Sequence, residues 1–188
     1  MPAPTTISAE PALSGPRETA NHRLVLPADA NHYGTLYAGA LLQYGLETAY
    51  ATATRAVGPA ANLMLRRVIA LECRQSVPVG SLVEIRGAVL SVRQGYLAVG
   101  VIGMPLRGQE LPWMDGLFGF AQVGPDGLPC VLPVEVEPVA ACPLWQPLFE
   151  RHAKLSKVRG ATASWLNKKK PPPGETPPTA GEPSRLTP

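Results

Sequence analysis

The sequence predicts an α+β fold in which an antiparallel β-sheet wraps one long central helix and a short helix follows near the C-terminus. Residues 36–57 are rich in Ala, Leu, Gly and Tyr, and their apolar positions cover most of a helix circumference, as in a buried helix. After residue 58 the pattern changes to β-prone runs separated by short Gly- and Pro-containing turns. One helix and one sheet bury each other most simply when the sheet packs around the helix.

The other elements follow in chain order. Residues 22–27 read as a first short strand that ends at Pro27, and Gly58 with Pro59 ends the long helix. The later strands are expected at residues 63–73, 82–92, 96–105 and 111–123, with turns at 77–80, 93–95, 107–109 and 124–127. A short helix is expected from about residue 143 to 157, with basic residues towards its C-terminus as the helix dipole favours.

Both ends of the chain differ in composition from its middle. Residues 1–21 and 169–188 are rich in Pro, Thr, Glu and Ser, and they carry too little apolar surface to offset the entropy of ordering them. We therefore expect two disordered tails around a folded domain at residues 22–137. A C-terminal extension with a short basic helix is expected at residues 138–168.

Composition and charge exclude several classes of protein. No apolar run reaches the roughly 20 residues that span a bilayer, and no secretory leader is recognised, so we expect a cytoplasmic protein without membrane insertion. The net charge of +3 hides a basic stretch at residues 151–170, and aromatic residues do not alternate with these charges as nucleic-acid binding would favour. The three cysteines are widely spaced and lack metal-ligand spacing, so no metal or other cofactor is expected.

The run from Ala30 to Gly39 is the candidate functional centre. It combines a turn containing Asn31 and Gly34 with the start of the long apolar helix. Free N–H groups at a helix start suit hydrogen bonds to a developing oxyanion. Two interpretations of Asn31 remain open, since its side chain could hold a substrate carbonyl or only cap the turn.

This order of motifs resembles that of the hotdog-fold acyl-CoA thioesterases. The resemblance rests on four segments in the family's order, at residues 26–39, 77–84, 124–133 and 145–152. It implies a hotdog fold and hydrolysis of an acyl-CoA thioester at the interface of a homodimer or a dimer of dimers. The asparagine of the family's turn corresponds to Asn31, and the substrate-binding residues implied around it are Gly34, Thr35, Tyr37, Ala38 and Gly39.

The carboxylate of the family's helix is displaced in this chain. Leu46 occupies the position at which an aspartate is usual, and Glu47 follows one residue later, about 100° around the helix. Glu47 and His32 are the candidate bases, although Glu47 could instead pair structurally and His32 could lie on the surface of the turn. In the family, a Gly-Arg-Ser-Ser stretch contacts CoA, and this chain has different residues there, at 95–98. The candidates for binding the CoA phosphates are therefore Arg66, Arg67, Arg93 or the basic tail.

Three functional hypotheses follow. The first is an acyl-CoA thioesterase in which Asn31 holds the carbonyl and Glu47 or His32 activates water. The second is a hotdog protein that binds an acyl group or acyl-CoA without hydrolysing it, because Leu46 replaces the usual acid. The third is a hotdog dehydratase or hydratase that uses His32 and Glu47. Each fits a homo-oligomer, because a single sheet around one helix leaves an edge strand for a second copy to cover.

Overall fold

A computed structural model describes residues 18–106 and 111–168, and it describes side chains as far as residue 159. The expected turn at 107–109 and most of the two expected disordered tails lie outside the described residues. The chain divides into two units after His152, and the second of them contains the later part of the C-terminal helix. The fold described below is that of the first unit.

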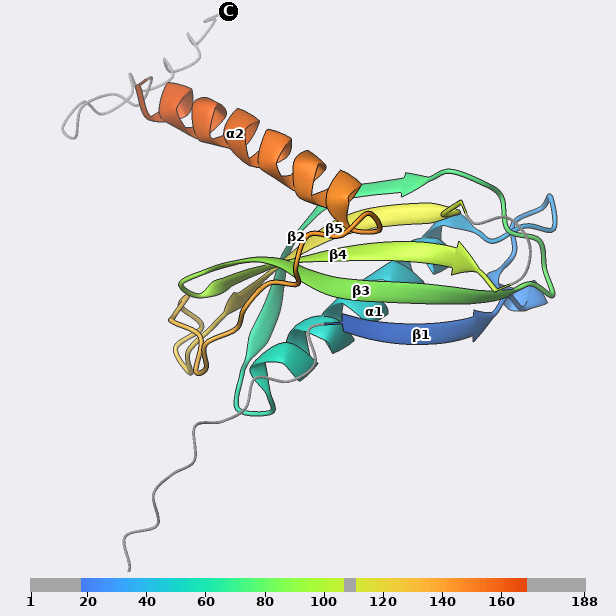
Figure 1. Cartoon of the computed structure of the whole chain (residues 1–188), viewed down its shortest axis with the longest axis horizontal. Coiled ribbons are helices and arrows are strands. Elements are labelled where there is room, and N and C mark those ends of the chain that lie inside the picture. Colours follow the sequence, from blue (N-terminus) through green and yellow to red (C-terminus); the bar gives the residue numbers. More distant parts are fainter. Residues whose placement is uncertain (1–17, 107–110, 169–188) are drawn as a thin grey trace, which may run out of the picture. The chain divides into compact units, whose positions relative to one another are not determined.

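The first unit contains a five-stranded antiparallel sheet with the strand order β1-β3-β4-β5-β2 (Figure 1). β1 and β2 are therefore the two edge strands. The strands are β1 (Glu18–Leu24), β2 (Leu63–Cys73), β3 (Leu82–Arg93), β4 (Tyr96–Pro105) and β5 (Met114–Gln122). The remaining elements are a 3-10 turn η1 (Pro27–Asp29), the long helix α1 (Ala38–Val57) and the C-terminal helix α2 (Gln146–Lys168).

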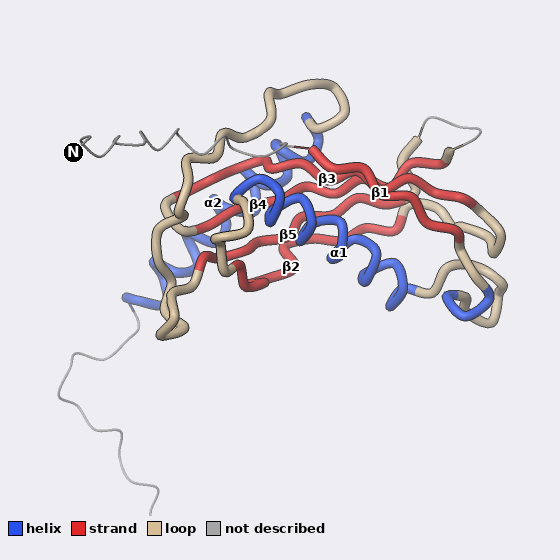
Figure 2. Tube along the Cα trace, turned by 90° about the horizontal axis from the view of Figure 1, so that it is seen from below, coloured by secondary structure: helices blue, strands red, loops and turns tan. Residues whose placement is uncertain are grey.

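The long helix α1 packs along one face of this sheet and contacts all five strands (Figure 2). The contact with β3 is close because Gly87 has no side chain: a Cβ there would collide with the side chains of Thr48 and Thr52. The expected architecture, one long helix against one antiparallel sheet, is confirmed. The expectation of a helix buried all round is wrong for the single chain, since Leu42 and Tyr50 of α1 are exposed.

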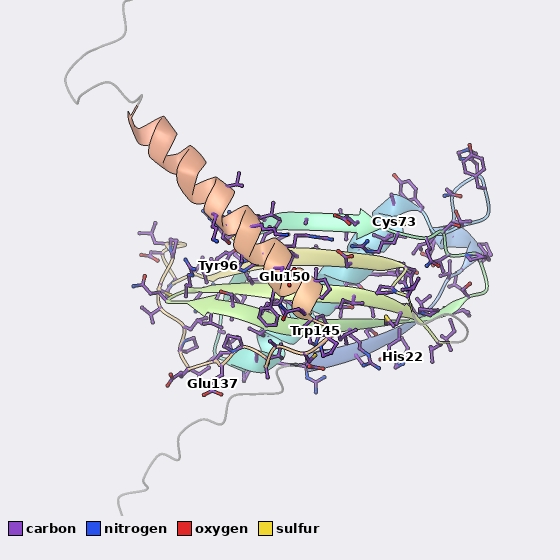
Figure 3. All side chains as sticks on the ribbon, turned by 45° about the horizontal axis from the view of Figure 1, so that its top comes forward. His22, Cys73, Tyr96, Glu137, Trp145 and Glu150 are labelled. Atoms are coloured by element: carbon purple, nitrogen blue, oxygen red, sulfur yellow. The ribbon has the colours of Figure 1, made fainter. Side chains whose placement is uncertain are left out.

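The opposite face of the sheet is covered by the segment that leads into α2. Trp145 is fully buried there, and its indole Nε1 donates a hydrogen bond to Glu18 at 3.1 Å (Figure 3). Arg151, in the first turns of α2, pairs with the buried carboxylate of Asp115 on β5, which also pairs with Arg74. These contacts fix the beginning of α2 on the outer face of the sheet.

Several predicted boundaries need correction. β1 begins at Glu18, so residues 18–21, which were assigned to the tail, belong to the first strand. These residues carry no apolar pattern that would mark a strand. They pair with β3 through their backbone, and such pairing does not require apolar side chains. β5 is shorter than the expected 111–123, and α2 continues to Lys168, beyond the expected end near residue 157.

Candidate functional site

The turn before α1 is held by a second loop of the chain. The backbone N–H of Leu36 donates to the carbonyl of Val77 at 2.8 Å, and the N–H of Val79 donates to the carbonyl of Gly34 at 3.0 Å. Gly34 has a φ of 71°, a conformation that residues with a Cβ rarely adopt. The turn that was predicted from Asn31 and Gly34 is thus built into the fold and braced by the loop between β2 and β3.

Asn31 uses its side chain to organise this turn. Its Oδ1 accepts the backbone N–H of Tyr33 at 2.9 Å and that of Thr35 at 3.3 Å, and its Nδ2 donates to the hydroxyl Oγ1 of Thr35 at 3.0 Å. Asn31 therefore caps the turn, which was one of the two open interpretations. An amide group carries two N–H donors, and among the described residues only one of them has an acceptor, so the second is available to a ligand's carbonyl.

The first turn of α1 offers backbone donors close to this asparagine. Tyr37 is the N-cap residue and makes no side-chain capping hydrogen bond. The N–H groups of Ala38, Gly39 and Ala40 precede the first intrahelical bond, which runs from the N–H of Leu41 to the carbonyl of Tyr37 at 2.9 Å. The exposed ring of Tyr37 lies against Gly39, so a ligand that approaches this glycine must share the space with that ring or displace it.

Glu47 lies further along α1 and is engaged on both carboxylate oxygens. Its Oε2 pairs with the guanidinium of Arg23 on β1, and its Oε1 accepts a hydrogen bond from the Nε2 of Gln43 at 2.8 Å. The side chains of Arg23 and Glu47 are 39% and 38% exposed, so the pair lies at the surface of the single chain. Glu47 is nine positions after Ala38, which is about 13.5 Å along a helix axis. No described hydrogen bond connects Glu47 with Asn31 or His32.

Tyr44 and Asp29 link α1 to the same turn. Tyr44 is buried, and the pKa of its hydroxyl is raised to about 12 by burial first and by the neighbouring Asp29 carboxylate second. Asp29 also binds the backbone on both sides of the turn: its carbonyl accepts the N–H of Tyr37 at 2.8 Å, and its Oδ2 accepts the N–H of Leu26 at 3.2 Å. The sequence did not single out Arg23, Asp29 or Tyr44, because their meeting depends on the packing of β1 on α1.

His32, the other candidate base, and Leu46, which replaces the usual aspartate, make fewer polar contacts than Glu47. His32 is exposed, and its described contact is with the ring of Tyr33, whose centroid is 3.9 Å away. Leu46, at the position where an aspartate was expected by resemblance, is partly buried and packs against the hydrophobic core. Of the predicted residues, the structure brings together Asn31, Gly34 and Thr35 in the turn, with Tyr37, Ala38 and Gly39 at the adjoining helix start.

Three arginines line a separate cavity on the outer face of the sheet. The cavity measures about 390 Å³ and lies between the start of β2 and the β3–β4 hairpin, where Arg66, Arg67, Arg93 and Tyr96 contribute to its wall. The guanidinium of Arg67 lies 5.6 Å from the centroid of the Tyr96 ring, a residue labelled in Figure 3. None of the ion pairs among the described residues involves these three arginines. The cavity is therefore positively charged.

The part of the chain that the structure describes lacks two kinds of feature. No helix there is long and apolar enough to cross a membrane. No group of three or more His, Cys, Asp or Glu side chains in that part of the chain is arranged to hold a metal ion.

Comparison with solved structures shows the fold. A variant of the acyl-CoA hydrolase from Staphylococcus aureus matches with a TM-score of 0.67 and 17% identity, over 81% of this chain and 93% of that chain. An apo hexameric acyl-CoA thioesterase matches with a TM-score of 0.63 and 24% identity, over 78% of this chain and 93% of that chain. The S. aureus hydrolase in complex with butyryl coenzyme A and coenzyme A matches with a TM-score of 0.65 and 16% identity, over 81% of this chain and 89% of that chain. The fold is the hotdog fold.

Comparisons of the sequence itself add nothing to this result. No model of a protein family matches the chain, and no curated protein matches it. Within this hotdog chain, the Asn31 turn precedes α1 whereas Glu47, which pairs with Arg23, lies further along the helix, and no described hydrogen bond joins the turn to Glu47.

Proposed function

We propose that this chain is an acyl-CoA thioesterase, which hydrolyses the thioester to a free acid and CoA at a site shared between two copies of the chain. The observation that carries the proposal is the Asn31 turn, where an unused amide N–H and the free N–H groups of Ala38 and Gly39 occur together at the start of α1. The hotdog fold that the chain shares with solved acyl-CoA hydrolases supports the same reaction class.

The turn supplies the carbonyl-holding half of the site. In this proposal the thioester oxygen accepts the second N–H of Asn31 and one of the first N–H groups of α1. Charge develops on that oxygen when water attacks, and fixed donors stabilise it without reorganising. Gly34 and Thr35 fix the turn, while Tyr37 and Gly39 border the approach to it.

Glu47 supplies the water-activating half. It accepts a proton from water as the oxygen attacks the carbonyl carbon, and the tetrahedral intermediate then collapses as the C–S bond breaks. The proton passes to the departing sulfur, so the products are a carboxylic acid and CoA with a free thiol. His32 is the second candidate for this role, because it lies on the same turn as Asn31 and is exposed.

Two copies of the chain are needed to bring these halves together. An attacking water and the carbonyl must lie within a few ångströms, whereas the start of α1 and Glu47 are about 13.5 Å apart along the helix. The edge strand β2 is suited to pair with a second copy, because Met64, Leu65 and Val68 are exposed on it. Leu42 and Tyr50 extend this apolar surface onto α1.

The arginine-lined cavity is proposed to bind the phosphates of CoA. Arg66 and Arg67 lie near the start of β2, whereas the end of β2 leads into the loop that braces the Asn31 turn. Antiparallel pairing of two β2 edges would bring the cavity of one copy towards the turn of the other. Guanidinium groups bind phosphate with charge-assisted, often bidentate hydrogen bonds.

Release of free thiol from a panel of short- to long-chain acyl-CoAs tests this function. Hydrolysis of at least one acyl-CoA, lost in the Asn31→Ala/Glu47→Ala double variant, is the expected result. A wild-type protein that releases no thiol from any member of the panel would contradict it.

A second candidate function has its own support. Leu46 packs against the core and Glu47 is occupied by Arg23 and Gln43, which is compatible with a protein that binds acyl-CoA without hydrolysing it. Tight acyl-CoA binding in a calorimeter, with the thioester intact afterwards, would favour that function.

The hydratase hypothesis requires His32 and Glu47 to act on one substrate, and hydration of crotonyl-CoA is its direct test.

A further inference from the structure

Arg23 reaches from the edge strand β1 to the helix α1. It pairs with Val83 of β3 in the strand register, and Val83 belongs to the core between the sheet and α1, so the Arg23 side chain starts on the helix-facing side of the sheet. Its guanidinium carbon lies 5.2 Å from the centroid of the Tyr44 ring, and its NH2 group donates to Glu47. One side chain thus contacts two residues of α1 that are three positions apart and lie on the same side of the helix.

The contacts around Glu47 leave its carboxylate little freedom to rotate. Arg23 holds one oxygen and Gln43 holds the other, and each donor comes from a different element of the structure. A carboxylate oxygen has more than one lone pair, so each remains able to accept one further hydrogen bond from water. Because the Glu47 side chain is 38% exposed, such a water has access.

Tyr44 connects this carboxylate to the carbonyl-holding turn. The guanidinium of Arg23 lies over its ring, and its hydroxyl is near enough to the Asp29 carboxylate, two residues before Asn31, for that carboxylate to raise its pKa. A continuous series of contacts therefore runs from Glu47 through Arg23 and Tyr44 to Asp29. In the proposed dimer this series would connect the Glu47 half of one site with the carbonyl-holding half of the other site.

We propose that Arg23 is a positioning residue for Glu47, which fixes the direction in which the carboxylate meets its water. The inference rests on the proposed thioesterase function. Arg23 acts through Glu47 and touches neither the substrate nor the reacting water. Its loss should therefore lower kcat, whereas KM for acyl-CoA should stay nearly constant.

A kinetic double-variant cycle tests this role. The variants are Arg23→Met, Glu47→Gln and the two together, with Arg23→Lys as the conservative replacement. Misplacing a catalytic group by about 1 Å can cost roughly 100-fold in rate, so Arg23→Met should lower kcat by about 10- to 100-fold with KM changed less than about 3-fold. Arg23→Lys should recover part of the loss, and Arg23→Met should have no further effect once Glu47 is already Gln.

Arg86 offers a matched control. It lies on the neighbouring strand β3 and makes its own ion pair, from Nε to Oε1 of Glu84 at 2.7 Å. Arg86→Met should leave kcat within about 2-fold of wild type. If Arg23→Met unfolds more readily than Arg86→Met, two other variants replace it in the comparison, namely Arg23→Lys and Arg23→Gln. Their activities are then measured at a temperature where all variants are folded.

The outcomes separate this inference from the function on which it rests. An active wild type whose kcat is unchanged in Arg23→Met, or equally reduced in Arg86→Met, would overturn the positioning role and leave the thioesterase function standing. Multiplicative losses in the Arg23→Met/Glu47→Gln variant would also overturn it, because they would show that Arg23 acts independently of Glu47. A wild type that hydrolyses no acyl-CoA would overturn the proposed function itself.

Discussion

The side chains of Asn31 and Thr35 close the turn before α1, with the amide Nδ2 of Asn31 donating to Thr35 Oγ1 at 3.0 Å. Oδ1 of the same amide accepts the backbone N–H groups of Tyr33 and Thr35. Asn31 therefore has a structural role and, in our proposal, a catalytic one. These two roles depend on different atoms, since the turn relies mainly on Oδ1 whereas the substrate would use an N–H.

Replacing Asn31 by aspartate separates these two roles. Asn31→Asp retains an oxygen for the N–H groups of Tyr33 and Thr35 but has no amide N–H, so the turn should persist while kcat falls about 100-fold. Asn31→Ala removes both the side-chain oxygen and the amide N–H. We expect a similar fall in kcat and a free energy of unfolding lower by about 1 kcal/mol or more. Steady-state kinetics and urea unfolding measure the two effects. An Asn31→Asp protein with wild-type kcat would assign Asn31 to the turn alone.

Tyr44 should make the stability of the domain depend on alkaline pH. Its pKa is raised from 10.0 to about 12 in the folded protein, by burial first and by the neighbouring Asp29 carboxylate second. The folded state therefore keeps the proton when the unfolded state has lost it, and this contribution is complete below pH 10 and is lost as the pH rises towards 12. Urea unfolding of wild type between pH 9 and 12 should show the loss, which should be smaller in Tyr44→Phe.

Tyr33 provides the comparison for that experiment. It is 79% exposed, so Tyr33→Phe should retain the alkaline loss of stability seen in wild type. An equal loss in wild type and Tyr44→Phe would show that the Tyr44 hydroxyl is not the group responsible.

The arginine cavity predicts a difference between substrates. Arg67→Met should raise KM for an acyl-CoA about 10-fold, because one charge-assisted contact to phosphate is lost. KM for the same acyl group on N-acetylcysteamine, which has no phosphate, should be unchanged. The control is Arg55→Met, at an exposed position near the end of α1. Equal effects of Arg67→Met on both substrates would place the phosphates elsewhere.

The exposed edge of β2 predicts how the chain associates. Val68 is 43% exposed there, and Val68→Asp should convert an oligomer into a monomer, as measured by light scattering. Leu128→Asp, at a residue 63% exposed in the turn after β5, should leave the oligomer intact. An oligomer that withstands Val68→Asp, or a wild type that is already monomeric, would exclude this edge as the interface.

The sequence predicted the architecture well because its signals are local. The apolar helix, the turn at Gly34 and the strand pairs joined by short hairpins all follow from residues close together in the chain, and the predicted bounds of β2 and β4 match the structure. The first residues of β1 were missed, because Glu18, Thr19 and Asn21 are polar and this part of the strand pairs through its backbone.

The contacts around Glu47 could not be predicted in the same way. Arg23 and Glu47 are 24 positions apart, and they meet because of the register of β1 on β3 and the rotation of α1 over the sheet. No local pattern encodes that rotation. For the same reason, no local pattern indicated that the Tyr44 hydroxyl lies near the carboxylate of Asp29.

Complementation between two inactive variants tests the central claim, that Asn31 and Glu47 act on one thioester from two copies of the chain. Asn31→Ala and Glu47→Gln, each inactive alone, are co-expressed and assayed together for thiol release. Random pairing in a two-fold dimer gives half mixed dimers, each with one intact site of two, so roughly a quarter of wild-type activity should return. A mixed sample as inactive as its components would contradict a site shared between chains.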